Sequence, residues 1–274
     1  VCPTILSKNW TLDFRVLNML AGNSRFPDEL RGDLQAQVDG LRAGTARVMG
    51  LFERYGRSVA TACEAEVMRH TREATRGALT EIKKGSYECR DRLDGDGVVA
   101  RQLHLRTRVT TSREKIEIGF HGTGASATGP MNAPGGAVKA ACLVAFRHLF
   151  PDLPTHGAVA EYLEVGIPEK SFLDAHFPRA VGGSTAEVVP RVVAACVEAL
   201  SQGVHGRAMG SGGGATYVIL QGKRGDDPYR MCVTLGSGGG ASGKGDGLNN
   251  GDGSTRFTCF QDLEGLERQF PLRI

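Results

Sequence analysis

The chain has 274 residues and a mass of 29.2 kDa, which is long for one compact domain and short for three. Hydrophobic residues make up 41% and charged residues 23%, values that are ordinary for folded proteins and exclude wholesale disorder. The 33 Lys and Arg residues are interspersed with 30 Asp and Glu residues, which excludes a basic stripe for nucleic acid. No apolar run approaches the ~20 residues that cross a membrane.

The cysteines point to a reducing compartment. Their number, seven, is odd, and no two form a Cys-x-x-Cys pair, so the spacing excludes a zinc ribbon and a thioredoxin-like motif. Several lie in apolar segments, where a thiol behaves as a small hydrophobic side chain. We therefore expect all seven to be reduced and structural, and the protein to be cytoplasmic. They are Cys2, Cys63, Cys89, Cys142, Cys196, Cys232 and Cys259.

The first third of the chain is predicted to be helical. A short helix capped by Thr11 precedes a long amphipathic pattern over 34–55, in which apolar residues recur at alternating spacings of 4 and 3. A second helix, over 59–82, is expected to fold back on the first as a hairpin. Gly40 and Gly44 lie four apart within the long helix, which predicts another element packed closely against that side.

Beyond residue 86 the pattern changes. Residues 99–109 alternate between apolar and polar, which predicts a half-buried strand, and a returning strand follows at 116–120. The other predicted elements are a buried helix at 137–150, a short strand within 160–165, a helix that begins at Ser184 or Thr185 and runs to Leu200, and strands at 215–221 and 230–235. The predicted fold class is α+β. We expect a helical region at 1–85, built as a helical hairpin, and an α+β region at 86–274, a mixed sheet with packed helices and a Gly-rich loop at 236–253.

The late glycine-rich loop contains, at 238–244, the Gly-x-x-x-x-Gly-Lys spacing of phosphate-binding loops. Gly245 stands where such a loop has the Ser or Thr that holds magnesium, and no apolar-periodic helix follows. We therefore interpret the segment as a glycine loop between a strand and the tail. The Asp and Asn residues within 246–252 offer oxygen atoms to calcium, but no Glu closes the loop, and we predict no metal site in this chain.

Four polar residues are the candidate catalytic residues. His121 ends a strand and leads into Gly122-Thr-Gly124, and Asn132 lies in a Gly- and Pro-rich turn where a small molecule could meet backbone N–H groups. Arg25 and Asp33 lie where the long helix begins, and we expect Asp33 in its first turn, where a carboxylate suits the helix dipole. Each has a plain structural alternative: an isolated histidine, a turn, or a cluster of caps and salt bridges.

The run from Asn23 to Gln37, Asn-Ser-Arg-Phe-Pro-Asp-Glu-Leu-Arg-Gly-Asp-Leu-Gln-Ala-Gln, resembles the hydantoinase B family. This family comprises the B-type subunits and domains of ATP-dependent N-methylhydantoinase, 5-oxoprolinase, and acetone or acetophenone carboxylase. Its pattern is an Arg, a Pro two residues on, and then Gly-Asp-Leu-x-Ala-Gln. Further similar stretches keep the family's order: Glu53-Arg-Tyr-Gly56, Phe120-His-Gly-Thr123, Gly129-Pro-Met-Asn132, 165–173, Phe177-Pro-Arg-Ala180, Gly182-Gly183 and 236–248.

The chain also departs from the family pattern. Gly119 stands where the family has Asp before Phe, and Pro154-Thr-His156 replaces a Pro-x-Asn element. Family chains are much longer, and the His- and Asp-rich motifs that their upstream part carries for metal and substrate do not occur in this sequence. The chain therefore resembles a split or trimmed form of the B component.

The resemblance implies a subunit of a complex that uses ATP and Mg on a partner, the hydantoinase A-type subunit. ATP there phosphorylates an unreactive carbonyl or enolate of a small-molecule substrate, and the activated species is then hydrolysed or carboxylated. The B component would supply a water-excluded chamber for this second half-reaction. Arg25 or Asp33 would orient an anionic intermediate, while Asn132 and the backbone of 122–124 would bind an oxyanion. A divalent metal, Zn or Mn, is compatible with the complex, and none is predicted in this chain.

Two other interpretations stay open. The departures from the family pattern favour a non-catalytic structural subunit of the same complex. An independent small-ligand-binding protein is the third interpretation. Hydantoin-like rings, oxoproline and ketones all fit these motifs as substrates, and we expect no nucleic-acid or membrane partner.

Overall fold

The computed structural model describes residues 4–212, 215–236, 238–247 and 268. The α+β fold class is confirmed: helices and strands are both abundant, and a mixed sheet has helices packed on it. The chain divides into two compact units, Val1–Arg69 and His70–Ile274, each of which is described by itself. The expected division at residue 85 stays a prediction. Over the described residues, no helix combines the length and the apolar character that a membrane span requires.

The first unit begins with a small hairpin and a capped helix. Strands β1 (Ser7–Lys8) and β2 (Thr11–Leu12) pair antiparallel, and the two residues between them, Asn9 and Trp10, have φ of 52° and 65°, as a tight hairpin turn requires. Helix α1 (Phe14–Gly22) follows. Its N-cap is Asp13, whose Oδ1 accepts a hydrogen bond of 2.9 Å from the N–H of Arg15. The prediction of Thr11 as the cap was wrong because Thr11 belongs to a strand.

Two long helices follow end to end. Helix α2 (Pro27–Tyr55) begins with a proline, whose missing N–H costs nothing in a first turn, and α3 (Arg57–Glu81) begins after Gly56, whose φ is 79°. Both predicted helices are confirmed. Because α2 begins at Pro27, Asp33 lies in its second turn and not in the first turn; the acidic residues of the first turn are Asp28 and Glu29.

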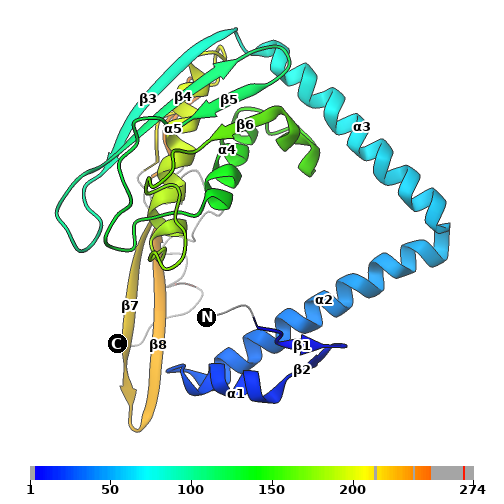
Figure 1. Ribbon diagram of the computed structural model, residues 1–274, viewed down its shortest axis with the longest axis vertical. Helices are drawn as coiled ribbons and strands as arrows, with labels where there is room; N and C mark the ends of the chain where they lie inside the picture. Colours follow the sequence, from blue (N-terminus) through cyan, green and yellow to red (C-terminus); the bar gives the residue numbers. More distant parts are fainter. Residues whose placement is uncertain (1–3, 213–214, 237, 248–267, 269–274) are drawn as a thin grey trace. The chain divides into compact units, whose positions relative to one another are not determined.

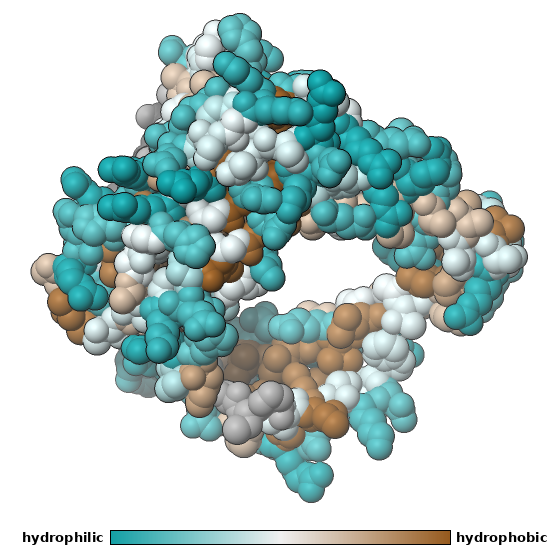
Figure 2. All heavy atoms as spheres, turned by 45° about the horizontal axis from the view of Figure 1, so that its top comes forward, coloured by the Kyte–Doolittle hydropathy of each residue, from teal (hydrophilic) through white to brown (hydrophobic). Residues whose placement is uncertain are grey.

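The expected side-by-side packing of these two helices is not found within the first unit. Val38 is the one buried residue of α2, and the four buried residues of α3 all lie in its second half. A Cβ added at Gly40 or Gly44 would meet no atom within 4 Å, so the close packing that these glycines predict is not found within the first unit. Large apolar side chains stay exposed along both helices: Leu41, Val48, Met49, Leu51, Tyr55, Val59 and Val67. Figure 2 shows brown, hydrophobic residues on the surface in the region of these helices.

The second unit is built on a four-stranded sheet in the order β3-β4-β5-β6 (Figure 1). Its strands are β3 (Gly85–Leu93), β4 (Leu103–Thr111), β5 (Ile116–Gly119) and β6 (Leu163–Gly166). The first three pair antiparallel, whereas β5 and β6 pair parallel, which makes the sheet mixed as predicted. Every second residue of β4 is buried, so one face of the sheet faces the core and the other faces outward.

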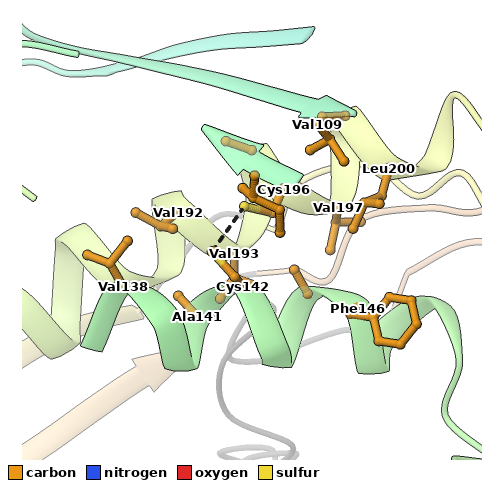
Figure 3. Packing of buried hydrophobic residues seen from close by; sticks show 14 of the residues in the cluster. Val109, Val138, Ala141, Cys142, Phe146, Val192, Val193, Cys196, Val197 and Leu200 are labelled. Atoms are coloured by element: carbon orange, nitrogen blue, oxygen red, sulfur yellow. Dashed lines mark hydrogen bonds between the residues drawn. The ribbon is translucent and has the colours of Figure 1, made fainter. Parts of the chain in front are cut away.

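Helices α4 (Gly135–Leu149) and α5 (Val189–Ser201) cover the inner face of the sheet. Figure 3 shows Val138 and Phe146 of α4 together with Val193 of α5 beneath Val109 of β4, all fully buried. Burial of each such side chain contributes about 1.5–3 kcal/mol. This cluster is the hydrophobic core that holds the second unit together.

Two cysteines meet inside this core. The Sγ atoms of Cys142 and Cys196 lie 4.0 Å apart between α4 and α5 (Figure 3), and this contact and burial hold the pKa of Cys196 well above its ordinary value. Burial likewise raises the pKa of Cys89 to about 12. These three and the exposed Cys63 are free thiols; the side chains of the other cysteines lie outside the described part.

The remaining elements are short or follow the helices. A 3₁₀ helix (Gly157–Tyr162) precedes β6, and a π-helical turn (Ser184–Val188) precedes α5, so α5 begins at Val189 and neither Ser184 nor Thr185 caps it. Strands β7 (Ala215–Arg224) and β8 (Asp227–Gly236) form an antiparallel hairpin, which confirms the two late strand predictions. Strand β3 was not predicted, because its sequence carries polar residues at most positions.

Candidate functional site

The segment between β5 and α4 is held in shape by the side chain of Asn132. This side chain is fully buried, and its Oδ1 accepts a hydrogen bond of 2.8 Å from the N–H of Ala127. Its Nδ2 donates to the carbonyl oxygens of Ala127 (3.2 Å), Gly129 (2.9 Å) and Ala180 (3.0 Å). Asn132 therefore fastens its own loop and ties it to the segment around residue 180.

A second buried polar side chain, Asp96, fastens the same loop from the other side. One carboxylate oxygen accepts from the N–H groups of Val98 (2.9 Å) and Val99 (2.6 Å), and the other accepts from Thr128 (2.9 Å) and Gly129 (3.0 Å). These backbone bonds, that of Val99 foremost, lower the pKa of Asp96 to about 2. The carboxylate therefore stays ionised at neutral pH without a cationic side chain.

Two glycines allow the backbones to come this close. A Cβ at Gly129 would lie 2.0 Å from the carbonyl oxygen of Asp96, and one at Gly183 would lie 2.5 Å from the Sδ of Met131. The N–H of Gly183 also donates to the carbonyl of Pro130 over 3.0 Å. Only glycine fits at position 129, because a Cβ there would collide with backbone, whereas at Gly183 a Cβ would first displace the flexible Met131 side chain.

An oriented histidine lies on the second of these loops. The Nε2 of His176 is 3.1 Å from Oδ1 of Asp174, whose Oδ2 accepts from the N–H of Lys170 over 3.2 Å. The N–H of Ala175, between them, donates to the carbonyl of Ala133 over 3.0 Å, so the pair is anchored next to the loop of Asn132. An exposed imidazole held by a carboxylate is suited to proton transfer.

The residues that follow Asp174 and His176 in the chain are exposed. Phe177, which is joined to Pro178 by a cis peptide bond, has 94% of its surface exposed, and Arg179 is exposed as well. His176 is not among the candidate residues that the sequence singled out. The signal that could have identified the pair is the Asp-x-His spacing of Asp174 and His176 next to a stretch that resembles the family.

The four predicted catalytic residues fall into two separate sets. His121 and Asn132 belong to the second unit, where His121 is exposed just beyond the end of β5 and Asn132 is buried. Arg25 and Asp33 belong to the first unit and are exposed, Arg25 before α2 and Asp33 within it. The contact that joins α1 to α2 comes instead from Arg31, whose Nη1 donates to Oδ1 of Asn18 over 2.7 Å.

The backbone of 122–124 was expected to bind an oxyanion, but two of its N–H groups already donate hydrogen bonds within the fold. The N–H of Thr123 donates to the carbonyl of Phe120 over 3.1 Å, and that of Gly124 donates to the carbonyl of His104 over 2.8 Å. His156, at one of the departures from the family pattern, caps a 3₁₀ helix, since its Nδ1 accepts from the N–H of Ala158 over 3.1 Å. These groups hold the fold locally.

The described part of the late glycine loop is closed on itself. The N–H groups of Ser242 and Gly245 bond reciprocally to each other's carbonyls, over 2.9 and 3.2 Å, and the N–H of Lys244 donates to the Ser242 hydroxyl. These amides are therefore not arranged as a phosphate cradle. Within the described ranges, no three His, Cys, Asp or Glu residues lie together as metal ligands. The oxygen-bearing residues of 248–252 lie outside those ranges.

Comparison with known proteins shows that this chain is similar in sequence to one protein family along nearly its whole length. A sequence profile described as "Hydantoinase B/oxoprolinase" matches residues 2–274. The 5-oxoprolinase 1 of Arabidopsis thaliana is 26% identical over 267 residues, which cover 92% of this chain and 20% of that protein. The chain spans about half the length of the first curated relatives that it matches.

Two solved structures share the fold. The ATP-dependent caprolactamase from Pseudomonas jessenii superposes with a TM-score of 0.81 at 18% identity, over 99% of this chain and 48% of its own. A nucleotide-free acetone carboxylase superposes with a TM-score of 0.78 at 15% identity, over 97% of this chain and 38% of its own. The fold of this chain is therefore that of one part of these longer chains.

Proposed function

Because the chain belongs to the hydantoinase B/oxoprolinase family, we propose that it is the B-type component of an ATP-dependent complex that hydrolyses a cyclic amide or carboxylates a ketone. The match over residues 2–274 is the observation that carries this proposal. The shared fold with a caprolactamase and an acetone carboxylase supports it, since one scaffold serves both a hydrolase and a carboxylase.

In this proposal ATP and Mg act on a partner, the hydantoinase A-type subunit, and this chain acts in the half-reaction that consumes the phosphorylated intermediate. The internally bonded glycine loop at 238–247 supports a nucleotide site elsewhere. Exposed apolar residues along α2, such as Leu41 and Leu51, support assembly with other subunits. Free thiols in the described part agree with a cytoplasmic location.

The chemical task suits a rigid pair of loops. Amides and ketones react poorly, and a phosphoryl group turns the carbonyl oxygen into a good leaving group. His176, oriented by Asp174, would move a proton in the step that follows, and Asn132 would position the loop that faces it. Arg25 or Asp33 stays the proposed residue that orients the anionic intermediate, and His121 stays a candidate catalytic residue. The described residues supply no cluster fit for the Zn or Mn of the complex, so no step is routed through a metal on this chain.

A structural role in the same complex is the second candidate. Asn132 uses its whole carboxamide within the fold, and His156 acts as a helix cap, so both have structural explanations. A scaffold of this kind would hold the complex together without contributing a catalytic residue.

Reconstitution separates the two candidates. The chain is co-expressed with the A-type subunit, assembly is measured by size-exclusion chromatography, and ATP-dependent turnover is measured with a hydantoin, 5-oxoproline and acetone. In the catalytic case, His176→Ala lowers kcat at least tenfold while assembly is kept, whereas the exposed His205→Ala is neutral. Arg25→Ala and Asn132→Ala test the earlier candidates in the same assay. Full turnover in every assembled variant would leave only the structural role.

A further inference from the structure

The outer face of the sheet contains a hollow from which the function above uses no residue except His121. Its volume is about 380 Å³, and residues of all four strands line it, together with His121. In Figure 2, in which the top of Figure 1 comes forward, hydrophilic residues dominate this part of the surface. The volume is within the range of pockets that take small metabolites. We call it the sheet hollow.

Two glycines make the floor of the sheet hollow. Gly119 of β5 and Gly166 of β6 stand opposite each other in the parallel pair. A Cβ at Gly119 would meet nothing closer than 3.8 Å, and one at Gly166 nothing closer than 4.0 Å. Neither has a positive φ. Neither packing nor backbone conformation therefore requires glycine here, and what the pair of glycines provides is empty space.

Positive charge gathers on one side of this floor. Arg90 of β3 and Arg106 of β4 are direct cross-strand partners, an arrangement in which like charges repel. Arg108, the next outward residue of β4, is bound to Glu88, with Nε–Oε1 and Nη2–Oε1 distances of 2.8 and 2.5 Å. The same Glu88 is 4.0 Å from Arg90. Glu88 thus pairs with two of the three guanidinium groups, and the third, that of Arg106, makes no ion pair among the described residues.

The acidic side of the sheet hollow does not compensate this charge. Glu117 and Glu164 both bind the ammonium group of Lys115, at 2.7 and 2.5 Å. These hydrogen bonds, that to Glu117 foremost, raise the pKa of Lys115. The two carboxylates are therefore bound at their own end of the sheet hollow, and positive charge stays at the other end, on Arg106 and on Arg90, which Glu88 approaches only to 4.0 Å.

We propose that the sheet hollow binds a small oxyanion, a carboxylate or phosphate group, through the guanidinium groups of Arg106 and Arg90. A planar guanidinium pairs with either group through two parallel hydrogen bonds, and such an anion would relieve the cross-strand repulsion. The body of the ligand lies over Gly119 and Gly166. This site rests on the geometry of the sheet alone and does not depend on the proposed function.

Two variants and a control test this site in the full chain. Binding of inorganic phosphate and of succinate is measured by isothermal titration calorimetry at low ionic strength. Arg106→Gln is expected to weaken binding at least tenfold. The matched control Arg113→Gln, in the exposed turn between β4 and β5, removes the same charge from the same hairpin and is expected to change binding less than twofold.

A side chain added at the floor of the sheet hollow tests ligand binding without changing the charge of the protein. Gly166→Val places a side chain in the open space of the sheet hollow, and a β-branched residue suits a strand. We expect the melting temperature to stay the same or rise while ligand binding falls at least tenfold. A response to phosphate alone identifies a phosphorylated ligand, and a response to succinate alone identifies a carboxylate; either supports the site.

Three results would overturn the proposal. The first is no heat with either probe at millimolar concentration, which would leave the arginines as a surface for an acidic protein. The second is equal weakening by Arg106→Gln and Arg113→Gln, which would show unspecific charge attraction. The third is unchanged binding to a folded Gly166→Val variant. None of these results requires ATP or a partner subunit, so they do not bear on the proposed function.

Discussion

Helices α4 and α5 of the second unit differ from α2 of the first in what their apolar residues contact. Val138, Phe146 and Val193 are fully buried between the two helices and the sheet, whereas Leu41 of α2 is 67% exposed. Both regions show helical apolar periodicity. The comparison teaches that a periodic apolar face predicts a helix, while its burial depends on whether the chain supplies a surface to cover it.

The sharpest way to break this comparison is to truncate one side chain in each region. Phe146→Ala should destabilise the second unit by about 3–5 kcal/mol, because it leaves a cavity beside Phe150, whose ring centre is 5.0 Å away. Leu41→Ala should change stability by less than about 0.5 kcal/mol. Urea unfolding followed by circular dichroism measures both. A large loss from Leu41→Ala would mean that α2 is buried in solution.

Paired glycine variants extend the comparison to backbone packing. Gly129→Ala should cost about 1–3 kcal/mol or more, because its Cβ would collide with the Asp96 carbonyl at 2.0 Å. Gly136→Ala in the first turn of α4 meets no atom within 4 Å and should be neutral or stabilising. Thermal unfolding of both variants is the measurement. Equal melting temperatures would contradict the close contact at Gly129.

The same loop offers a test by pH. The folded pKa of Asp96, about 2, lies below its ordinary value of 3.8, so its stabilising effect is complete above the ordinary value and is lost as the pH falls toward the folded one. Asp96→Asn should therefore destabilise the protein clearly at neutral pH and progressively less in acid. Asp94→Asn, exposed in the same turn, should have little effect at either pH. A difference in stability between the wild type and Asp96→Asn that is the same in acid as at neutral pH would contradict this role of the carboxylate.

The smallest expected effect concerns the exposed helix. Gly44→Ala in α2 should stabilise the first unit by roughly 0.5–1 kcal/mol, because an added Cβ meets nothing within 4 Å and alanine favours the helix. Differential scanning calorimetry of the wild type and the variant shows whether stability rises or falls. Destabilisation would show that another surface, such as a second copy of the chain, packs against α2.

Sequence periodicity was sufficient for the elements with strong local patterns. It predicted α2, α4, β4 and the β7–β8 hairpin, because apolar spacing depends on residues two to four apart. It missed β3, whose polar outward residues include Glu88 and Arg90. The expected packing of α2 against α3 is not found within the first unit and stays a prediction for the rest of α3, since a helical pattern does not identify the surface that covers it.

The candidate site was predictable only in part. The sequence drew attention to Asn132 and His121, which lie in the segment between β5 and α4, and their catalytic roles stay predictions. The pairing of Asp174 with His176 and the contact of Asn132 with Ala180 depend on how two distant loops approach each other. Local patterns do not encode that approach.

The sequence by itself determined the α+β class, most helices and strands, and membership of the hydantoinase B/oxoprolinase family, because these depend on local spacing and collinear motifs. Only the tertiary structure decided that Gly119 meets Gly166 across a parallel strand pair, that Arg90 faces Arg106, and that the Asn132 carboxamide is used within the fold. These outcomes follow from strand register and loop packing, which join residues far apart in the chain.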